Sequence, residues 1–288
     1  KLVAGKVAIV YVGGDNDDVV SEQENGAHMQ AEYERLGGSF KLIHREGEGH
    51  HPHGLADATP VLNFMQHHSF GNSEPTHEAI SYGPHPKQVL DFWRAPSDKP
   101  TPVAVYIHGG GWSGGSRLDV GSVETFLKAG ISVAAVEYRF ISEATADGVV
   151  PPVKGPMSDS ARAIQFLRSK SAEWNIRKDR FAAWGGSAGG CSSLWLAFHK
   201  DMGVASSQDL VSRESTRLVA VAAVAPQTTL DPAQMKEWTP NSRYGAQSFG
   251  ISGTKSADAF TTFLAERERL LPWIAEYSPY ALATEDAP

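Results

Sequence analysis

Short apolar runs rich in β-branched residues alternate along this chain with stretches of helical spacing, and this alternation limits the folds open to it. Each apolar run is closed by Gly, Asp or Pro, which is typical of a buried parallel strand. The runs cover residues 6–12, 40–44, 101–108, 131–137, 181–184 and 217–225. The helical stretches cover residues 22–36, 120–129, 158–174 and 260–276. Strand alternating with helix predicts an α/β fold, with a mostly parallel sheet flanked by helices on both faces.

Composition and charge exclude several classes of protein. The chain has 288 residues, 41% of them apolar, which is enough for a substantial core. A net charge of −7 argues against electrostatic binding of nucleic acid. The single cysteine, Cys191, excludes an internal disulfide. The longest apolar run, about nine residues near 218–226, is too short to span a membrane. Without a charged and then apolar leader, we expect a soluble protein, cytoplasmic or exported after removal of its signal.

The turn Gly185-Gly186-Ser187-Ala188-Gly189 carries the strongest chemical signal. It matches G-x-S-x-G, whose glycines allow a strained strand-to-helix turn that lifts the serine hydroxyl above the edge of the sheet. A predicted strand precedes it and an apolar helical stretch follows, as the motif requires. We therefore predict that Ser187 is a nucleophile and that Cys191, on the following helix, is a packed residue.

A glycine run follows another predicted strand, in the segment His108-Gly109-Gly110-Gly111-Trp112. Glycines at this place let backbone N–H groups approach a developing oxyanion closely. The same segment also satisfies G-x-G-x-x-G through Gly109, Gly111 and Gly114, the pattern of a dinucleotide-binding oxidoreductase. That alternative explains neither His108 nor the serine turn.

A serine nucleophile needs a base, and the usual chain order in such sheets is Ser, then Asp, then His. The only histidine after Ser187 is His199, about 18 Å further along the predicted helix and out of reach.

The missing groups stand before the serine. A strand and an acidic turn lead to Asp17, and a second strand leads into a histidine loop that begins with His50. These are the two strand-end positions where the acid and the base are needed. Asp15 and Asp18 flank the acid, and His51 and His53 follow the base, so they remain alternatives.

With HGGGW, GGSAGG and these Asp and His loops, the chain resembles the α/β-hydrolase carboxylesterases of the hormone-sensitive-lipase-like and HGGxW esterase group. The likeness comes in two rearranged blocks. Residues from about 75 to 288, beginning with ISYGPHPKQVLDFWRAP, resemble the family's first part, and residues 1–70 resemble its last part.

We interpret the chain as a circular permutant of one α/β-hydrolase domain spanning residues 1–288. The block 1–70 carries the acid and the base, and the block 79–288 carries the oxyanion loop and the nucleophile. Residues 69–78 form the linker, and these ten residues can span up to about 35 Å. Permutation is tolerated where the original termini lie close together.

The resemblance implies a catalytic triad. Ser187 is the nucleophile, His50 the general base and then acid, and Asp17 the group that fixes the imidazole tautomer. The backbone N–H groups of Gly110, Gly111 and Ala188 form the oxyanion hole, with Gly109 as an alternative to Gly111. Trp112 is expected as a wall of the substrate pocket, and residues 226–256 as a cap insertion. One departure is Gly186, where many relatives carry Asp.

The expected substrates are small or short-chain acyl esters, and no cofactor is required. A metal site at His50, His51 and His53 is not expected, because Pro52 breaks the spacing that ligands on one helix need. Two alternatives remain: an amidase or peptidase with the same triad, and a binding protein whose triad is not assembled. The sequence leaves open a homo-oligomer or a domain swap, in which one chain's block 1–70 completes a neighbour's site.

Overall fold

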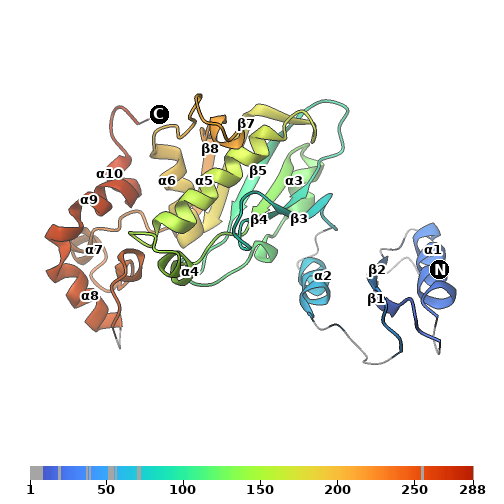
Figure 1. The fold of residues 1–288 in the computed structure, drawn as a ribbon. Helices are drawn as coiled ribbons and strands as arrows, with labels where there is room; N and C mark the ends of the chain where they lie inside the picture. The colour runs from blue at the N-terminus through green and yellow to red at the C-terminus, as the bar shows by residue number, and fades with distance from the viewer. Residues whose placement is uncertain are drawn as a thin grey trace. The chain divides into compact units, whose positions relative to one another are not determined.

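In the computed structural model, the chain forms two compact units (Figure 1). Unit 1 comprises Lys1–Ser73 and unit 2 comprises Glu74–Pro288. The boundary between them falls within the predicted linker 69–78. That the two units make up one hydrolase domain stays a prediction. The structure describes residues 9–18, 21–36, 38, 40–50, 55, 57–69, 73–253 and 256–287.

Unit 1 contains a parallel pair of strands with helices around it. Strand β1 (Ile9–Gly14) pairs in parallel with β2 (Phe40–Arg45), in a register that places Val12 opposite Ile43. Between the two strands come the π-helical turn η2 (Gln23–Ala27) and helix α1 (His28–Arg35), and α2 (Thr59–Ser69) follows β2. The two predicted strands and the predicted helix 22–36 are thus confirmed. The expectation of full burial is wrong for most of β1 and β2, because this small unit covers them incompletely and only Gly13, Gly14 and Phe40 of the two strands are buried.

Unit 2 is built on a six-stranded sheet in the order β3-β4-β6-β5-β7-β8 (Figure 1). Its strands are β3 (His77–Ser81), β4 (Val89–Trp93), β5 (Thr101–Ile107), β6 (Ser132–Val136), β7 (Ile176–Gly186) and β8 (Ala220–Val224). Strands β5 to β8 run parallel to one another, whereas β4 is antiparallel to both β3 and β6. Four of these strands match predicted runs. The sequence analysis missed β3 and β4.

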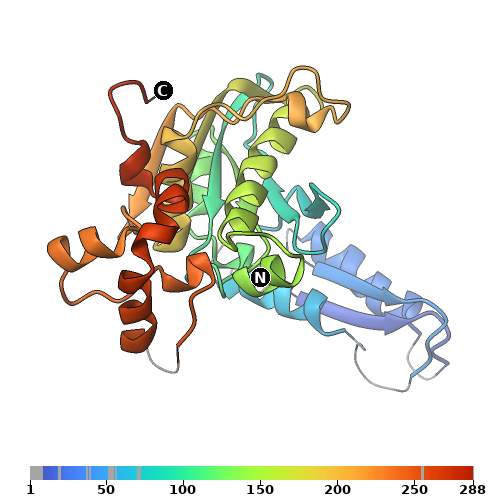
Figure 2. The ribbon, with the colours of Figure 1, turned by 60° about the vertical axis from the view of Figure 1, so that its left-hand side comes forward.

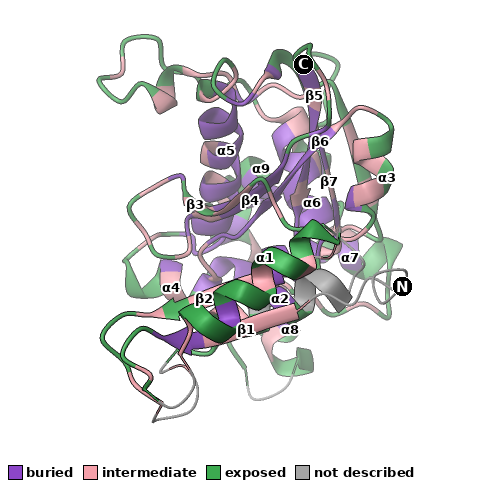
Figure 3. Ribbon diagram, turned by 90° about the vertical axis from the view of Figure 1, so that its right-hand side faces the viewer, coloured by how far each residue is buried: buried purple, intermediate pink, exposed green. Residues whose placement is uncertain are grey.

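Alternate residues of each central strand face opposite sides of the sheet, so the core has two layers. On β6, Ala134 and Val136 join one cluster, and Val133 and Ala135 join the other. Helices α5 (Lys154–Ser169) and α6 (Ala188–Phe198) cover the first side, and α3 (Val123–Lys128) covers the second (Figure 2). Figure 3 shows this buried core along the central strands of the sheet. The prediction of helices on both faces is confirmed.

In unit 2, three predictions of where an element begins, ends or is buried differ from the structure. Strand β8 is the edge of the sheet, so Val224 is 67% exposed rather than buried as predicted for residues 217–225. The predicted helix 260–276 is two helices, α8 (Ser256–Ala265) and α9 (Arg267–Tyr277), which are separated at Glu266. Helix α5 begins earlier than the predicted 158–174 because Pro156 fits within a first helical turn.

The remaining elements are short. They are η3 (Arg117–Asp119), α4 (Ile141–Ala146), η4 (Val211–Arg213), α7 (Pro232–Trp238), η5 (Ala246–Phe249) and α10 (Pro279–Leu282). Within the described residues, no helix has both the length and the apolar character needed to cross a membrane.

The backbones at the carboxyl ends of β5 and β7 lie unusually close together. A Cβ atom added at Gly185 or at Gly189 would overlap the carbonyl oxygen of Ile107 at the end of β5. Only glycine therefore lets the turn after β7 and the first turn of α6 lie directly against β5. This contact aligns the two loops that leave the sheet at this edge.

The substitution Gly189→Ala is expected to destabilise unit 2 by about 3 kcal/mol or more, because the new methyl group overlaps rigid backbone. Urea denaturation followed by tryptophan fluorescence reports on this unit alone, since all seven tryptophans lie in it. Gly121→Ala is the control, because a Cβ at Gly121 meets nothing within 4 Å. Equal urea midpoints for Gly189→Ala and the parent protein would contradict the steric argument.

Candidate active site

Ser187 lies on a strained turn between the end of β7 and the start of α6. Its φ of +51° and ψ of −121° are rarely adopted by a residue with a side chain. Two backbone hydrogen bonds hold it there: the Ser187 N–H donates to Val224 O at 2.9 Å, and the Cys191 N–H donates to Ser187 O at 2.9 Å. The strand-turn-helix geometry predicted from G-x-S-x-G is confirmed.

The serine hydroxyl has a neighbour that the sequence analysis missed. Gln227, in the loop after β8, donates from Nε2 to Ser187 Oγ at 3.1 Å. Its position just beyond the carboxyl end of a predicted parallel strand could have indicated that Gln227 belongs to the site. An amide donates and accepts hydrogen bonds but does not take up a proton near neutral pH, so Gln227 is not a general base.

The glycine loop lies beside the serine. A Cβ added at Gly109 would be 2.9 Å from Gly186 O and 3.6 Å from Ser187 Cβ. Gly110 has a φ of +97° and Gly111 a φ of +62°, conformations that favour glycine.

The predicted oxyanion donors are available in this arrangement. No hydrogen bond within the described residues uses the N–H groups of Gly110, Gly111 or Ala188. Unengaged donors beside a nucleophile suit the stabilisation of a developing negative charge.

The dinucleotide-binding alternative does not fit this loop. Its pattern requires the glycines to open a helix whose N-terminus binds a pyrophosphate. After Gly114 the chain instead enters η3, a single short turn over Arg117–Asp119.

A buried histidine and carboxylate hold the glycine loop in place. The two ring nitrogens of His108 lie 2.8 Å from Gly109 O and 3.2 Å from Glu137 Oε1, and its ring stacks on Tyr138. Burial by itself raises the pKa of Glu137, but the hydrogen bond from His108 and the charges of His108 and Lys87 outweigh it, and the pKa lies below its ordinary value. Because both ring nitrogens are engaged, His108 is a structural residue of the loop.

Trp112 packs in the core. Its side chain is 1% exposed, and the indole N–H donates to Ser192 Oγ at 3.0 Å. The indole thus joins the end of the glycine loop to helix α6. Its predicted contact with substrate stays a prediction.

Unit 1 brings together two of the three predicted triad residues. His50 Nδ1 lies 3.1 Å from Asp17 Oδ2, and the two residues follow the carboxyl ends of β2 and β1. Asp15, the alternative acid, accepts instead from the Gly47 N–H at 2.7 Å, which ties the two loops together. Asp18 is exposed, and the alternatives His51 and His53 lie outside the described residues. Ser187 belongs to unit 2, so its pairing with His50 stays a prediction.

Two residues set aside by the sequence analysis are packed away from the reaction centre. His199 follows the end of α6, where its Nε2 lies 3.2 Å from Glu276 Oε1. Cys191 is fully buried, and burial raises the pKa of its thiol. In the described parts of the chain, no group of three or more His, Cys, Asp or Glu side chains is placed to hold a metal ion.

A serine on a strained turn after a parallel strand, beside a glycine loop from the adjacent strand, defines an α/β-hydrolase fold. The chain belongs to the BD-FAE family, whose family model matches residues 90–268. The match covers strands β4 to β8, the serine turn and the helices of unit 2 up to the start of α9.

Curated relatives share part of this chain. Gut esterase 1 of Caenorhabditis elegans is 34% identical over 101 residues, which cover 32% of this chain and 17% of that protein. Esterase LipC of Mycobacterium tuberculosis is 30% identical over 137 residues, which cover 46% of this chain and 31% of that protein. The matched part therefore spans less than a third of either relative's length.

Solved structures share the fold. Esterase B from Lactobacillus rhamnosis has a TM-score of 0.51 at 19% identity, covering 80% of this chain and 70% of that one. A bifunctional GH43-CE protein from Bacteroides eggerthii has a TM-score of 0.53 at 18% identity, covering 74% and 29%.

Glu137→Gln is expected to destabilise unit 2 by about 2 kcal/mol at pH 7, because it removes the charge that His108 and Lys87 face. A carboxyl group with a lowered pKa stabilises the fold above its unfolded value, near 4.5, and loses this contribution as the pH falls through the folded pKa. The difference between variant and parent should therefore shrink below pH 4.5.

Urea denaturation followed by tryptophan fluorescence, at pH 7, 4 and 3, measures this difference. Glu237→Gln is the control, since Glu237 is exposed on α7. A difference that is constant over this pH range would show that the charge of Glu137 does not contribute.

Proposed function

We propose that this protein is a serine esterase that cleaves carboxylic esters through an acyl-enzyme intermediate on Ser187. The observation that carries the proposal is the strained Ser187 turn beside a glycine loop whose N–H groups are unengaged. Membership of the BD-FAE family and the two esterases among the relatives support the same chemistry.

We further propose that His50 and Asp17 complete the site as its base and acid. The carboxyl ends of parallel strands meet at one edge of a sheet, and all three residues follow such ends. The proposal requires the block 1–70 to present Asp17 and His50 to Ser187. The chain would then be a circularly permuted hydrolase domain, with residues 1–70 supplying the last part of the fold.

The first half of the proposed reaction forms the acyl-enzyme on Ser187. Asp17 accepts from His50 Nδ1, which leaves Nε2 to take the Ser187 hydroxyl proton as Oγ attacks the ester carbonyl carbon. The N–H groups of Gly110, Gly111 and Ala188 bind the oxyanion. The carbon–oxygen bond to the alcohol then breaks, and the alcohol leaves with the proton from His50.

Deacylation repeats these steps with water. His50 takes a proton from the water as its oxygen attacks the acyl carbon, and the proton returns to Ser187 as the free acid leaves. Gln227 donates to a lone pair of Ser187 Oγ, so the hydroxyl proton remains free for His50. The proposal needs no cofactor, and its substrates are small or short-chain acyl esters.

Hydrolysis of 4-nitrophenyl acetate tests the proposal. We expect Ser187→Ala and His50→Gln each to lower kcat/KM by about 10³-fold or more, and Asp17→Asn to lower it by about 10²- to 10⁴-fold. His199→Gln is the matched control, because that imidazole faces Glu276 instead. If only Ser187→Ala is inactive, the base lies elsewhere, with His51 and His53 next. A folded parent protein that hydrolyses no ester would favour the binding-protein alternative.

A mixing experiment tests whether the triad forms within one chain. We expect a mixture of full-length Ser187→Ala and His50→Gln proteins to stay inactive, because each chain would keep its own incomplete site. The mixture is denatured and refolded together, with the parent protein treated in the same way as the control. Recovery of up to about a quarter of the parent activity would show that the block 1–70 is exchanged between chains.

A further inference from the structure

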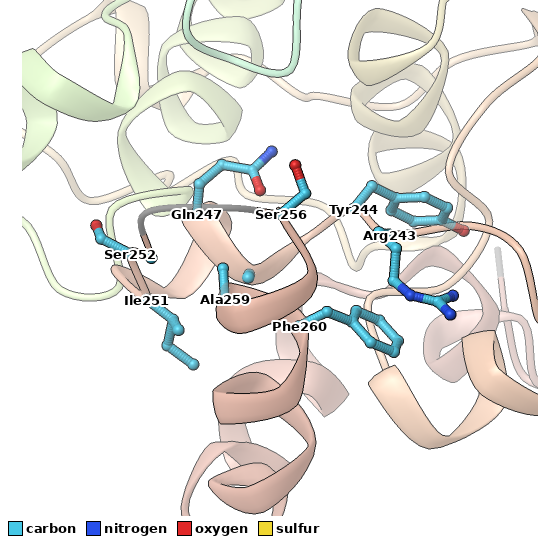
Figure 4. Close-up of a pocket in the computed structure, with 10 residues that line it drawn as sticks. Arg243, Tyr244, Gln247, Ile251, Ser252, Ser256, Ala259 and Phe260 are labelled. Carbon is cyan, nitrogen blue, oxygen red and sulfur yellow. The ribbon is translucent and has the colours of Figure 1, made fainter.

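Unit 2 contains a cavity of about 280 Å³ in the region predicted as a cap (Figure 4). Its walls come from the segment around η5 and from the first turns of α8. The lining residues are Arg243, Tyr244, Ala246, Gln247, Ile251, Ser252, Gly253, Ser256, Ala259 and Phe260.

Contacts at two of its walls connect the cavity to the nucleophile. Gln247 borders the glycine loop, because a Cβ added at Gly111 would lie 3.6 Å from its Nε2. Tyr244 packs against the core cluster that includes Cys191 of α6. Cys191 in turn bonds to the backbone of Ser187. An ester held at Ser187 therefore has this cavity beside the oxyanion loop.

The cavity has a positive wall. Arg243 forms no ion pair within the described residues, and only its Nη1 is used, to donate to the carbonyl oxygens of Pro240 and Ser242. Its guanidinium lies 5.1 Å from the ring centre of Phe260, another residue of the lining (Figure 4). Nε and Nη2 remain available to a ligand.

The other lining groups are compatible with an anion. No carboxylate is found among the described residues that line the cavity. Helix α8 begins at Ser256, and a helix N-terminus favours negative charge. Asp258 lies in that first turn but does not line the cavity. Ile251, Ala259 and Phe260 add apolar surface, and Gln247, Ser252 and Ser256 add uncharged polar groups.

We propose that this cavity is a substrate subsite that selects esters carrying a carboxylate, and that Arg243 is its specificity-determining residue. The inference rests on the proposed esterase function and specifies its substrate class. A guanidinium binds a carboxylate through two parallel N–H donors, which a neutral ester group does not match. The chain's net charge of −7 repels anions in general, so recognition of such a substrate needs a local cation.

Two matched substrate pairs test the subsite. In mono-4-nitrophenyl succinate and its methyl ester, the charge is on the acyl side. In 4-acetoxybenzoate and its methyl ester, the charge is on the alcohol side. We expect Arg243→Gln to lower kcat/KM about tenfold or more for the anionic member of one pair, mainly through KM, and to change the neutral members less than about twofold.

Two further variants serve as comparisons. Arg243→Lys should restore only part of the preference, because an ammonium lacks the two-donor geometry. Arg180→Gln is the matched control, since Arg180 is an exposed arginine on β7, about 20 Å before Gly186 along the strand. An anionic-to-neutral ratio that is the same in the parent and Arg243→Gln would overturn the inference and leave the esterase function standing.

Binding separates failure of the subsite from failure of the catalytic proposal. Isothermal titration measures 4-acetoxybenzoate and mono-4-nitrophenyl succinate binding to Ser187→Ala, with and without Arg243→Gln. The parent protein could fail to hydrolyse any ester while binding still depends on Arg243. That result would support the anion subsite and reject the proposed esterase function. Equal binding by both proteins, together with equal substrate ratios, would reject the subsite.

Discussion

The site depends on one steric constraint, the contact between the ends of β5 and β7. The carbonyl oxygen of Ile107 lies where any side chain at Gly185 or Gly189 would be. This contact brings the glycine loop after β5 against the turn after β7, with Gly109 next to the backbone of Gly186. The unusual backbone of Ser187 follows from the same geometry, because the chain must reverse from strand to helix without leaving β5. Backbone packing thus brings the nucleophile and the oxyanion donors together.

Buried carboxylates stabilise the strands and loops around this contact. Asp159 on α5 accepts from Gln88 and from Nε and Nη2 of Arg139, so it joins the helix to the segments before β4 and after β6. Glu137 binds His108 beneath the glycine loop. Charges in such surroundings must be paired to avoid a large desolvation cost, so these partners are fixed in position. The loops of the site are therefore attached to the sheet by specific polar contacts.

Local patterns in the sequence were sufficient to predict most strands and the serine turn, because each depends on residues close in the chain. Strand-end positions indicated the acidic turn and the histidine loop, whereas the choice of Asp17 and His50 came from the family resemblance. Strand β4 was missed because Asp91 interrupts its apolar run. The structure pairs this buried carboxylate with Arg117 at 2.9 Å, a contact between distant residues. Gln227 was missed for a similar reason, since its position after a strand end does not by itself specify a contact with Ser187.

The sequence by itself determined the type of fold and the chemistry of the turn, since alternating strand and helix patterns and G-x-S-x-G act through local backbone preferences. Only the tertiary structure decided which groups meet. The order of strands makes β8 an exposed edge although its residues are apolar, and it places Trp112 in the core although it follows the loop of the site. Packing of the segment around η5 against α8 also forms the cavity, which lies beside Gly111 and is lined by Arg243, Gln247 and Phe260. Such contacts follow from packing between segments far apart in the chain, which no local pattern specifies.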